Sequence, residues 1–270
     1  MTEYVLRFIA GGMIVSTFAI LGDMLRPKSF GGLLGAAPSA ALATLGIAVV
    51  EHGPKYAAAE SWSMIYGAAA LACYSIAVCQ LLMRFRFSAL PALGATCHHH
   101  RFRRMACGCL CPARGFRRRR VMPVKLSSSA LRQTRWYEYG VRFLLGGLAT
   151  VFAGAVSARF GVAIGGLFLA LPAIFCASAT LIESHERRTK QKAGLSGRRR
   201  GQQAAALDAA GAGLGSLGLA AFAATFYALA AASVIAAFAA AILAWAAVSV
   251  SAWWLRRKLR ITSHTTQPKR

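Results

Sequence analysis

The chain has 270 residues, of which 57% are hydrophobic and 15% are charged, and its formal net charge is +24. Its mean hydropathy of +0.50 excludes an ordinary soluble domain, in which about half of the residues are apolar. The basic residues are clustered: 13 of the 32 Lys and Arg lie in 84–136, 7 in 184–203 and 6 in 255–270. Because these blocks alternate with apolar stretches, they are typical of cytoplasmic loops of a membrane protein rather than of a nucleic-acid interface.

Three apolar stretches precede the first basic block, at 8–22, 30–50 and 64–83. Each is near the length of about 20 residues that crosses a bilayer. The first is not interpreted as a signal peptide, because Glu3 precedes it and the same element recurs in the middle of the chain. The segment 51–61 between the second and third stretches is predicted to be a loop outside the cell.

Four more stretches are predicted after the first basic block. Those at 141–157 and 162–182 are separated by only four residues, so we expect a tight antiparallel pair. In 204–254 the only charged residue is Asp208, and this length suits two spans, with a turn expected at 228–233. Trp253 and Trp254 precede a basic run, which is the pattern of an interfacial anchor at the end of the last helix.

The two halves of the chain share a pattern of aromatic, glycine and proline residues. The recurring positions are Arg7-Phe8, Gly11-Gly12, Gly31-Gly32-Leu33 and Pro38 in the first half, and Arg142-Phe143, Gly146-Gly147, Gly165-Gly166-Leu167 and Pro172 in the second. We interpret them as two related membrane units. Three spans before residue 84 and four after residue 139 place every basic block in the cytoplasm and give the units opposite orientations.

The predicted fold class is therefore an all-α membrane bundle of about seven transmembrane helices, in which two inverted units are joined by a basic linker. The first unit covers 1–96 with three helices and a truncated fourth, and the second covers 136–255 with four. The linker at 97–135 is predicted to be disordered, because it is basic and has little apolar periodicity. The tail at 256–270 is predicted to be cytoplasmic, with the protein in the bacterial inner membrane.

The linker is rich in Cys, His and Arg where the second unit has its fourth helix. Its Cys-x-Cys-x-Cys run beside three consecutive His is not the paired spacing of a zinc site, so no metal is predicted. Helices rich in Ala, Leu and Gly yield such residues when GC-rich codons are read out of frame. We interpret 97–121 as a frameshift product that fuses two adjacent genes. The nucleotide sequence tests this interpretation, which requires an apolar helix in an alternative frame.

Several segments resemble one bacterial family of small integral membrane proteins, described only as a domain of unknown function (family 3147). The residues that carry the resemblance are Arg135-Trp136-Tyr137-Glu138-Tyr139, Arg142-Phe143, Gly146-Gly147, Gly165–Glu183 with its Pro172, and in the first unit Arg7-Phe8, Gly11-Gly12 and Leu25–Phe30 with the later Pro38-Ser39. The resemblance implies a membrane bundle of about four helices per unit and no established activity. No functional residue is carried over from it.

Pro38 and Pro172 are candidate pathway residues, each predicted inside the second helix of its unit. Proline removes a backbone donor and clashes with the carbonyl four residues back, here that of Leu34 and that of Phe168. Broken helices are where transporters bind ions. The alternative is a structural kink whose freed groups are satisfied by neighbouring residues.

Glu60 and Asp208 are the other candidates, because they align when the two units are compared, and Gly67 then matches Gly215. Each carboxylate is predicted at the start of a helix, at opposite mouths of a pathway, where it could accept a cation or a proton. The alternative is ordinary helix capping, since the macrodipole favours an anion at a helix start.

Only eight acidic residues are present, mostly at span ends, so an enzyme is not predicted. The leading functional prediction is a transporter of a small solute or ion, built as an inverted pair. The alternatives are a membrane structural or assembly protein without transport activity, and a non-functional fusion of two genes. The expected partners are the lipid bilayer and, at the basic loops, anionic headgroups. A homo-oligomer is left open, and neither a cofactor nor nucleic acid is predicted.

Overall fold

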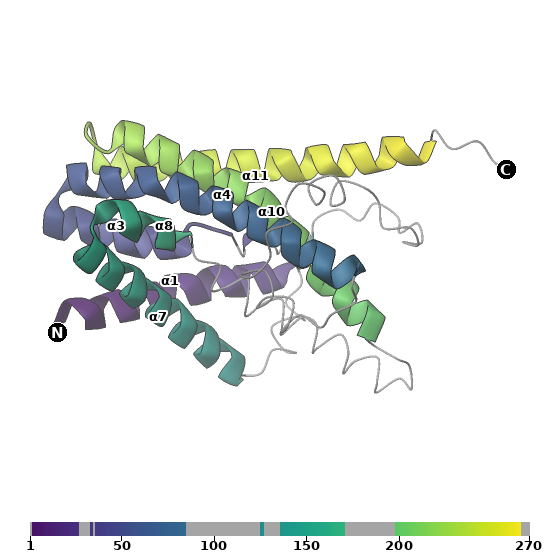
Figure 1. Ribbon diagram of the computed structural model, residues 1–270, viewed down its shortest axis with the longest axis horizontal. Coiled ribbons are helices and arrows are strands. Elements are labelled where there is room, and N and C mark those ends of the chain that lie inside the picture. The colour runs from purple at the N-terminus through teal and green to yellow at the C-terminus, as the bar shows by residue number, and fades with distance from the viewer. Residues whose placement is uncertain are drawn as a thin grey trace.

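The computed structural model describes residues 2–26, 33–34, 36–84, 125–126, 136–170 and 198–265. Within these ranges the chain is almost entirely helical, which confirms the predicted all-α membrane class (Figure 1). The helices are α1 (Thr2–Met24), α3 (Ser39–His52), α4 (Pro54–Arg84), α7 (Trp136–Phe160), α8 (Val162–Leu169), α10 (Arg198–Leu229) and α11 (Val234–Thr265). Two short strands, β1 (Leu25–Arg26) and β2 (Lys125–Leu126), pair antiparallel.

Five of these helices are long and apolar enough to cross a membrane, and they make the chain a multi-pass membrane protein. The spans are Glu3–Gly22 in α1, Pro54–Met83 in α4, Tyr139–Phe160 in α7, Gln202–Leu229 in α10 and Val234–Arg256 in α11. The apolar helix α3 has 14 residues and is shorter than a full span. The predicted division of 204–254 is confirmed, because α10 ends at Leu229 and α11 begins at Val234.

Two predicted loops are largely helical instead. The loop expected at 51–61 is reduced to Gly53, because α3 continues to His52 and α4 begins at Pro54. The loop of four residues expected between the predicted spans 141–157 and 162–182 is reduced to Gly161, because α7 continues to Phe160 and α8 begins at Val162. Gly53 and Gly161 both have φ of 87°, a backbone conformation that residues with a side chain rarely adopt. Each glycine therefore reverses the direction of the chain within a single residue. Proline suits the first turn of α4, where its missing N–H would have no helical partner.

The crossing of α1 and α7 is antiparallel, because residues early in α1 meet residues late in α7 (Figure 1). A Cβ atom on Gly147 would lie 2.6 Å from the ring of Phe8, and one on Gly12 would lie 2.7 Å from the ring of Phe143. The two rings themselves meet edge to face, with centroids 5.6 Å apart. Glycine at these two positions is therefore what lets the helix backbones approach so closely.

A second pair of contacts is reciprocal in the same way. Gly67 of α4 packs against the carbonyl oxygen of Leu167 in α8, at 2.5 Å from the position of its missing Cβ. Gly215 of α10 packs against the carbonyl oxygen of Leu33, at 2.8 Å. When the two units are aligned, Gly67 matches Gly215 and Leu33 matches Leu167. The long helix α4 of the first half thus packs against α8 of the second half, and the long helix α10 of the second half packs against the helical residues 33–34 of the first half.

The remaining core is built mainly from alanine, with a few large side chains between the helices. α10 packs along α4 on one side and along α11 on the other, while α8 lies against α4 and α7 (Figure 1). Phe222, Phe226, Leu45 and Met64 are among its fully buried side chains.

Apart from β2, the predicted linker at 97–135 lies outside the described residues. Its Cys and His residues and the proposed frameshift product at 97–121 are therefore not described by the structure.

Candidate functional site

Pro38 is buried and immediately precedes α3, so the helical path of the predicted second span is broken there. Residues 33–34 are helical, 36–38 form a turn, and α3 begins at Ser39. The Leu34 carbonyl, expected to lose its partner, accepts a hydrogen bond from the Ala37 N–H at 3.1 Å. The break is present, and this carbonyl is satisfied locally. The equivalent Pro172 lies outside the described residues.

Glu60 lies in the interior of the bundle, with 1% of its surface exposed. The prediction that it lies at the start of a helix is wrong, and with it the capping alternative, because α4 begins at Pro54, well before Glu60. Both carboxylate oxygens are buried and have no hydrogen-bond partner among the described residues. A buried carboxylate in a membrane span is costly unless it is neutralised by a proton, a cation or an ion-pair partner.

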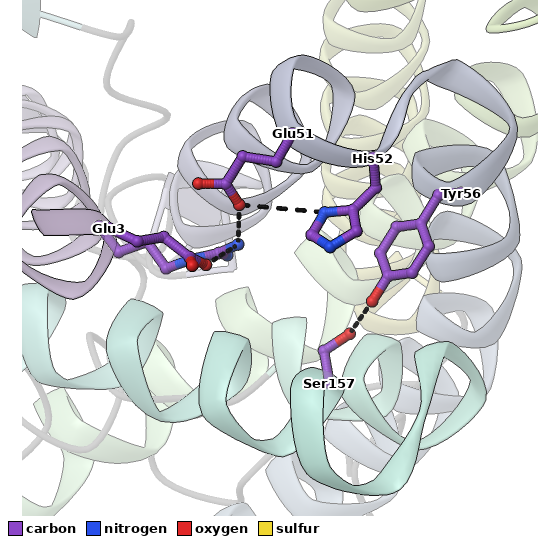
Figure 2. A network of polar contacts seen from close by, with 6 residues as sticks. Glu3, Glu51, His52, Tyr56 and Ser157 are labelled. Carbon is purple, nitrogen blue, oxygen red and sulfur yellow. Dashed lines mark hydrogen bonds and ion pairs between the residues drawn. The ribbon is translucent and has the colours of Figure 1, made fainter. Parts of the chain in front are cut away.

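Two hydroxyl groups lie beside this carboxylate. The Tyr56 hydroxyl, one turn before Glu60 on α4, is 3.0 Å from Ser157 Oγ on α7 (Figure 2). Gly165 and Gly166, which are neighbours in α8, pack against Ser157 and against the backbone carbonyl of Glu60, so Ser157 and Glu60 approach the same part of α8. Ser63 serves a different purpose, because it donates to the backbone carbonyls of Glu60 at 2.9 Å and Val162 at 3.3 Å.

Arg7 of α1 is the buried cation at this end of the bundle, with 4% of its surface exposed. Its guanidinium donates to Glu3 Oε1 and to Glu51 Oε2, each at 2.9 Å (Figure 2). Its Nη1 is buried without a partner in the described part of the chain. Arg7 therefore joins the start of α1 to the end of α3.

His52 connects this network to the surface. Its ring stacks on that of Tyr56, with centroids 4.5 Å apart, and its Nδ1 lies 3.9 Å from Glu51 Oε2 (Figure 2). The side chain is 48% exposed. The polar contacts thus connect the exposed side chains of Glu3 and His52 to the buried Arg7 and Ser157, through residues of α1, α3, α4 and α7.

Asp208 lies in the opposite half of the molecule and is also buried, with 3% of its surface exposed. The rings of Trp62 and Tyr227 are 5.0 Å apart, and Ser75 lies against Gly213, so α4 and α10 run antiparallel. This register places Asp208 near the level of Gln80, about 30 Å from Glu60 along α4 at 1.5 Å per residue. The capping prediction is wrong here too, because α10 begins at Arg198.

The structure therefore does not bring Glu60 and Asp208 together. It instead brings together, at the end of the bundle where α3 meets α4, several residues that the sequence reasoning had not selected: Glu3, Arg7, Glu51, His52, Tyr56 and Ser157. One signal could have found Arg7, because an ionisable residue within a membrane span is by default a functional candidate. Nothing local marks Tyr56 or Ser157, which are 101 residues apart in the chain.

Within the described ranges, no group of three or more His, Cys, Asp or Glu side chains is arranged to hold a metal ion. Comparison of the chain with protein-family models, with curated proteins and with solved structures finds no match. The function is therefore argued from the buried carboxylate and its polar neighbours.

Proposed function

We propose that this chain is an inner-membrane transporter that carries protons or another small cation, with Glu60 as the binding group. The observation that carries the proposal is a carboxylate buried within a membrane-spanning helix, without a hydrogen-bond partner among the described residues. Leaving a buried ionised group unpaired costs several kcal/mol. A bound proton or cation removes that cost, which makes the site a receptor for positive charge.

The reciprocal contacts support an arrangement of two related units with opposite orientations. Gly147 receives Phe8 just as Gly12 receives Phe143, and the helices that carry them run antiparallel. A two-fold axis in the membrane plane relates antiparallel helices in this way, and inverted units are a frequent construction of secondary transporters. In this arrangement Glu60 serves one face of the membrane and Asp208 the other.

Purified chain in proteoliposomes containing a trapped pH-sensitive dye, and in a parallel set that takes up radiolabelled cations, tests the proposal. A proton gradient, then gradients of Na⁺, K⁺ and a small organic ammonium ion, are imposed in turn. We expect ion flux in the parent and at least a tenfold loss in Glu60→Gln. Glu186→Gln removes a carboxylate from a predicted loop and is the matched control, expected to behave like the parent.

Two results would overturn transport through Glu60. One is equal flux in the parent and in Glu60→Gln. The other is no flux of any of these ions in the parent, which would favour the structural or assembly role. The close glycine packing of α1 on α7 is compatible with such a role. Frame analysis of the gene separately tests whether the chain is a fusion product.

A further inference from the structure

We propose that the hydroxyls of Tyr56 and Ser157 form a proton relay that connects solvent to Glu60. This inference rests on the proposed function and specifies it, because it commits to the proton as the species that reaches this carboxylate. The half-exposed ring of His52, which stacks on Tyr56, marks the outer end of the path and takes no proton itself. The relay runs through the 3.0 Å contact between the two hydroxyls and ends at the buried carboxylate of Glu60, because Ser157 and the Glu60 backbone pack against the consecutive glycines Gly165 and Gly166 of α8.

The order of burial along this path is that of an access route. His52 is exposed, Tyr56 is half-buried, and Ser157 and Glu60 are buried. Each step also changes helix, from the end of α3 to the start of α4, across to α7 and back to α4. Three side chains, one each from α3, α4 and α7, therefore lie in sequence between solvent and one carboxylate, which a purely structural pair of hydroxyls would not require.

A hydroxyl group can accept one proton while it releases another, because it is both donor and acceptor. In the proposed step a water at the surface gives a proton to the Tyr56 oxygen, and Tyr56 passes its own proton to Ser157. Ser157 passes its proton to Glu60, whose carboxylate becomes a neutral carboxylic acid. One proton leaves solvent, one is gained by Glu60, and both hydroxyls are restored. In this proposal, side-chain rotation or one bridging water completes the last transfer, from Ser157 to Glu60.

The surroundings of Glu60 offer no comparable second route among the described residues. The Ser63 hydroxyl is committed to two backbone carbonyls, and Gly166 packs directly against the Glu60 carbonyl. α8, which lies against this part of α4, carries no ionisable side chain. The charged or titratable groups that face the site come from α1 and α3: Glu3, Arg7, Glu51 and His52.

The chemistry also favours a proton over a divalent metal cation. Among the described residues, the side-chain oxygens of the path are those of the Glu60 carboxylate and of the Tyr56 and Ser157 hydroxyls. Divalent cations such as Ca²⁺ take six to eight oxygen ligands, and Mg²⁺ takes six in near-ideal octahedral geometry. A proton requires only the carboxylate and one hydrogen-bonded neighbour.

Infrared spectroscopy of the full chain in lipid bilayers measures the relay directly. The C=O stretch of protonated Glu60 is the band that disappears in Glu60→Gln, and its shift after transfer to D₂O reports how fast the acid exchanges. We expect exchange to slow at least tenfold in Tyr56→Phe and, independently, in Ser157→Ala. Tyr66→Phe, at an exposed position on the same helix, and Ser63→Ala should exchange at the parental rate.

The outcomes separate the relay from the function on which it rests. Parental exchange in folded Tyr56→Phe and Ser157→Ala overturns the relay, even if Glu60→Gln removes both the band and the flux. Slowed exchange in the Tyr66→Phe and Ser63→Ala controls overturns it as well, because the effect would then not be specific to the path. If no carboxylic acid band depends on Glu60 at any pH, proton binding at Glu60 itself is rejected.

Discussion

The aromatic ring of Phe143 meets that of Phe8 edge to face, with an interplanar angle of 83°, at the crossing of α7 and α1. Each ring also lies against a glycine of the opposite helix. Edge-to-face rings of this kind contribute about 0.5–1.5 kcal/mol beyond the area that they bury. The crossing is therefore held by a matched pair of contacts, and each can be weakened separately.

Adding one methyl group at this crossing should destabilise the protein. In Gly147→Ala the new Cβ would lie 2.7 Å from the backbone oxygen of Phe8, which cannot move away as a side chain can. We expect a loss of about 1–3 kcal/mol, the usual cost of overpacking, and a lower Tm in detergent. Gly140→Ala, on the same helix with open space at its Cβ, should keep or raise the Tm. Equal Tm changes in the two variants would contradict the proposed close approach.

The reversal between α3 and α4 should depend on backbone conformation alone. A Cβ atom added at Gly53 or at Gly46 would meet open space, but only Gly53 of these two has positive φ. We expect Gly53→Ala to cost about 1–3 kcal/mol through strain, and Gly46→Ala to be neutral or stabilising. Thermal unfolding of the two variants, measured in one detergent, checks this, and a Gly53→Ala variant as stable as Gly46→Ala would disprove it.

Removing one carboxylate from the Arg7 network should destabilise the end of the bundle. Glu51→Gln leaves the buried guanidinium with Glu3 as its remaining carboxylate partner among the described residues. We expect a loss of about 1–3 kcal/mol, because a hydrogen bond to a charged group is replaced by a weaker one. The loss should be smaller than for a fully buried pair, since Glu51 is partly exposed. Lys55→Gln, at an exposed position nearby, is the control, and a similar change in both variants would argue against the ion pair.

The orientation of the chain is predicted from its basic blocks. Reporter fusions at residues 110, 195 and 270 should all report the cytoplasm, because loops rich in Lys and Arg remain on that side. With the N-terminus predicted outside, this result requires an odd number of crossings before residue 110 and an even number between 110 and 195. A periplasmic signal at residue 195 would contradict the proposed opposite orientation of the two units.

The approximate positions of the long helices could be predicted from the local amino-acid composition. The turn between α10 and α11 was predicted at 228–233, and the structure places it directly after Leu229. Apolar length is a property of consecutive residues, so it can be read without knowing their neighbours in space. Helix ends were less accurate, because the apolar pattern does not show that a single glycine with positive φ can replace a loop, as it does at Gly53.

The sequence by itself determined that the chain is helical, that it belongs in a membrane, and that Glu60 and Asp208 are candidate carboxylates. Only the tertiary structure decided that Glu60 lies inside the bundle rather than at a helix cap, and that the hydroxyls of Tyr56 and Ser157 meet. The reason is physical: hydropathy and charge act along the chain, whereas a polar site depends on which helix faces meet. Those faces are set by the close approach of α1 to α7 and of α4 to α8, through glycines whose partners lie far away in the sequence.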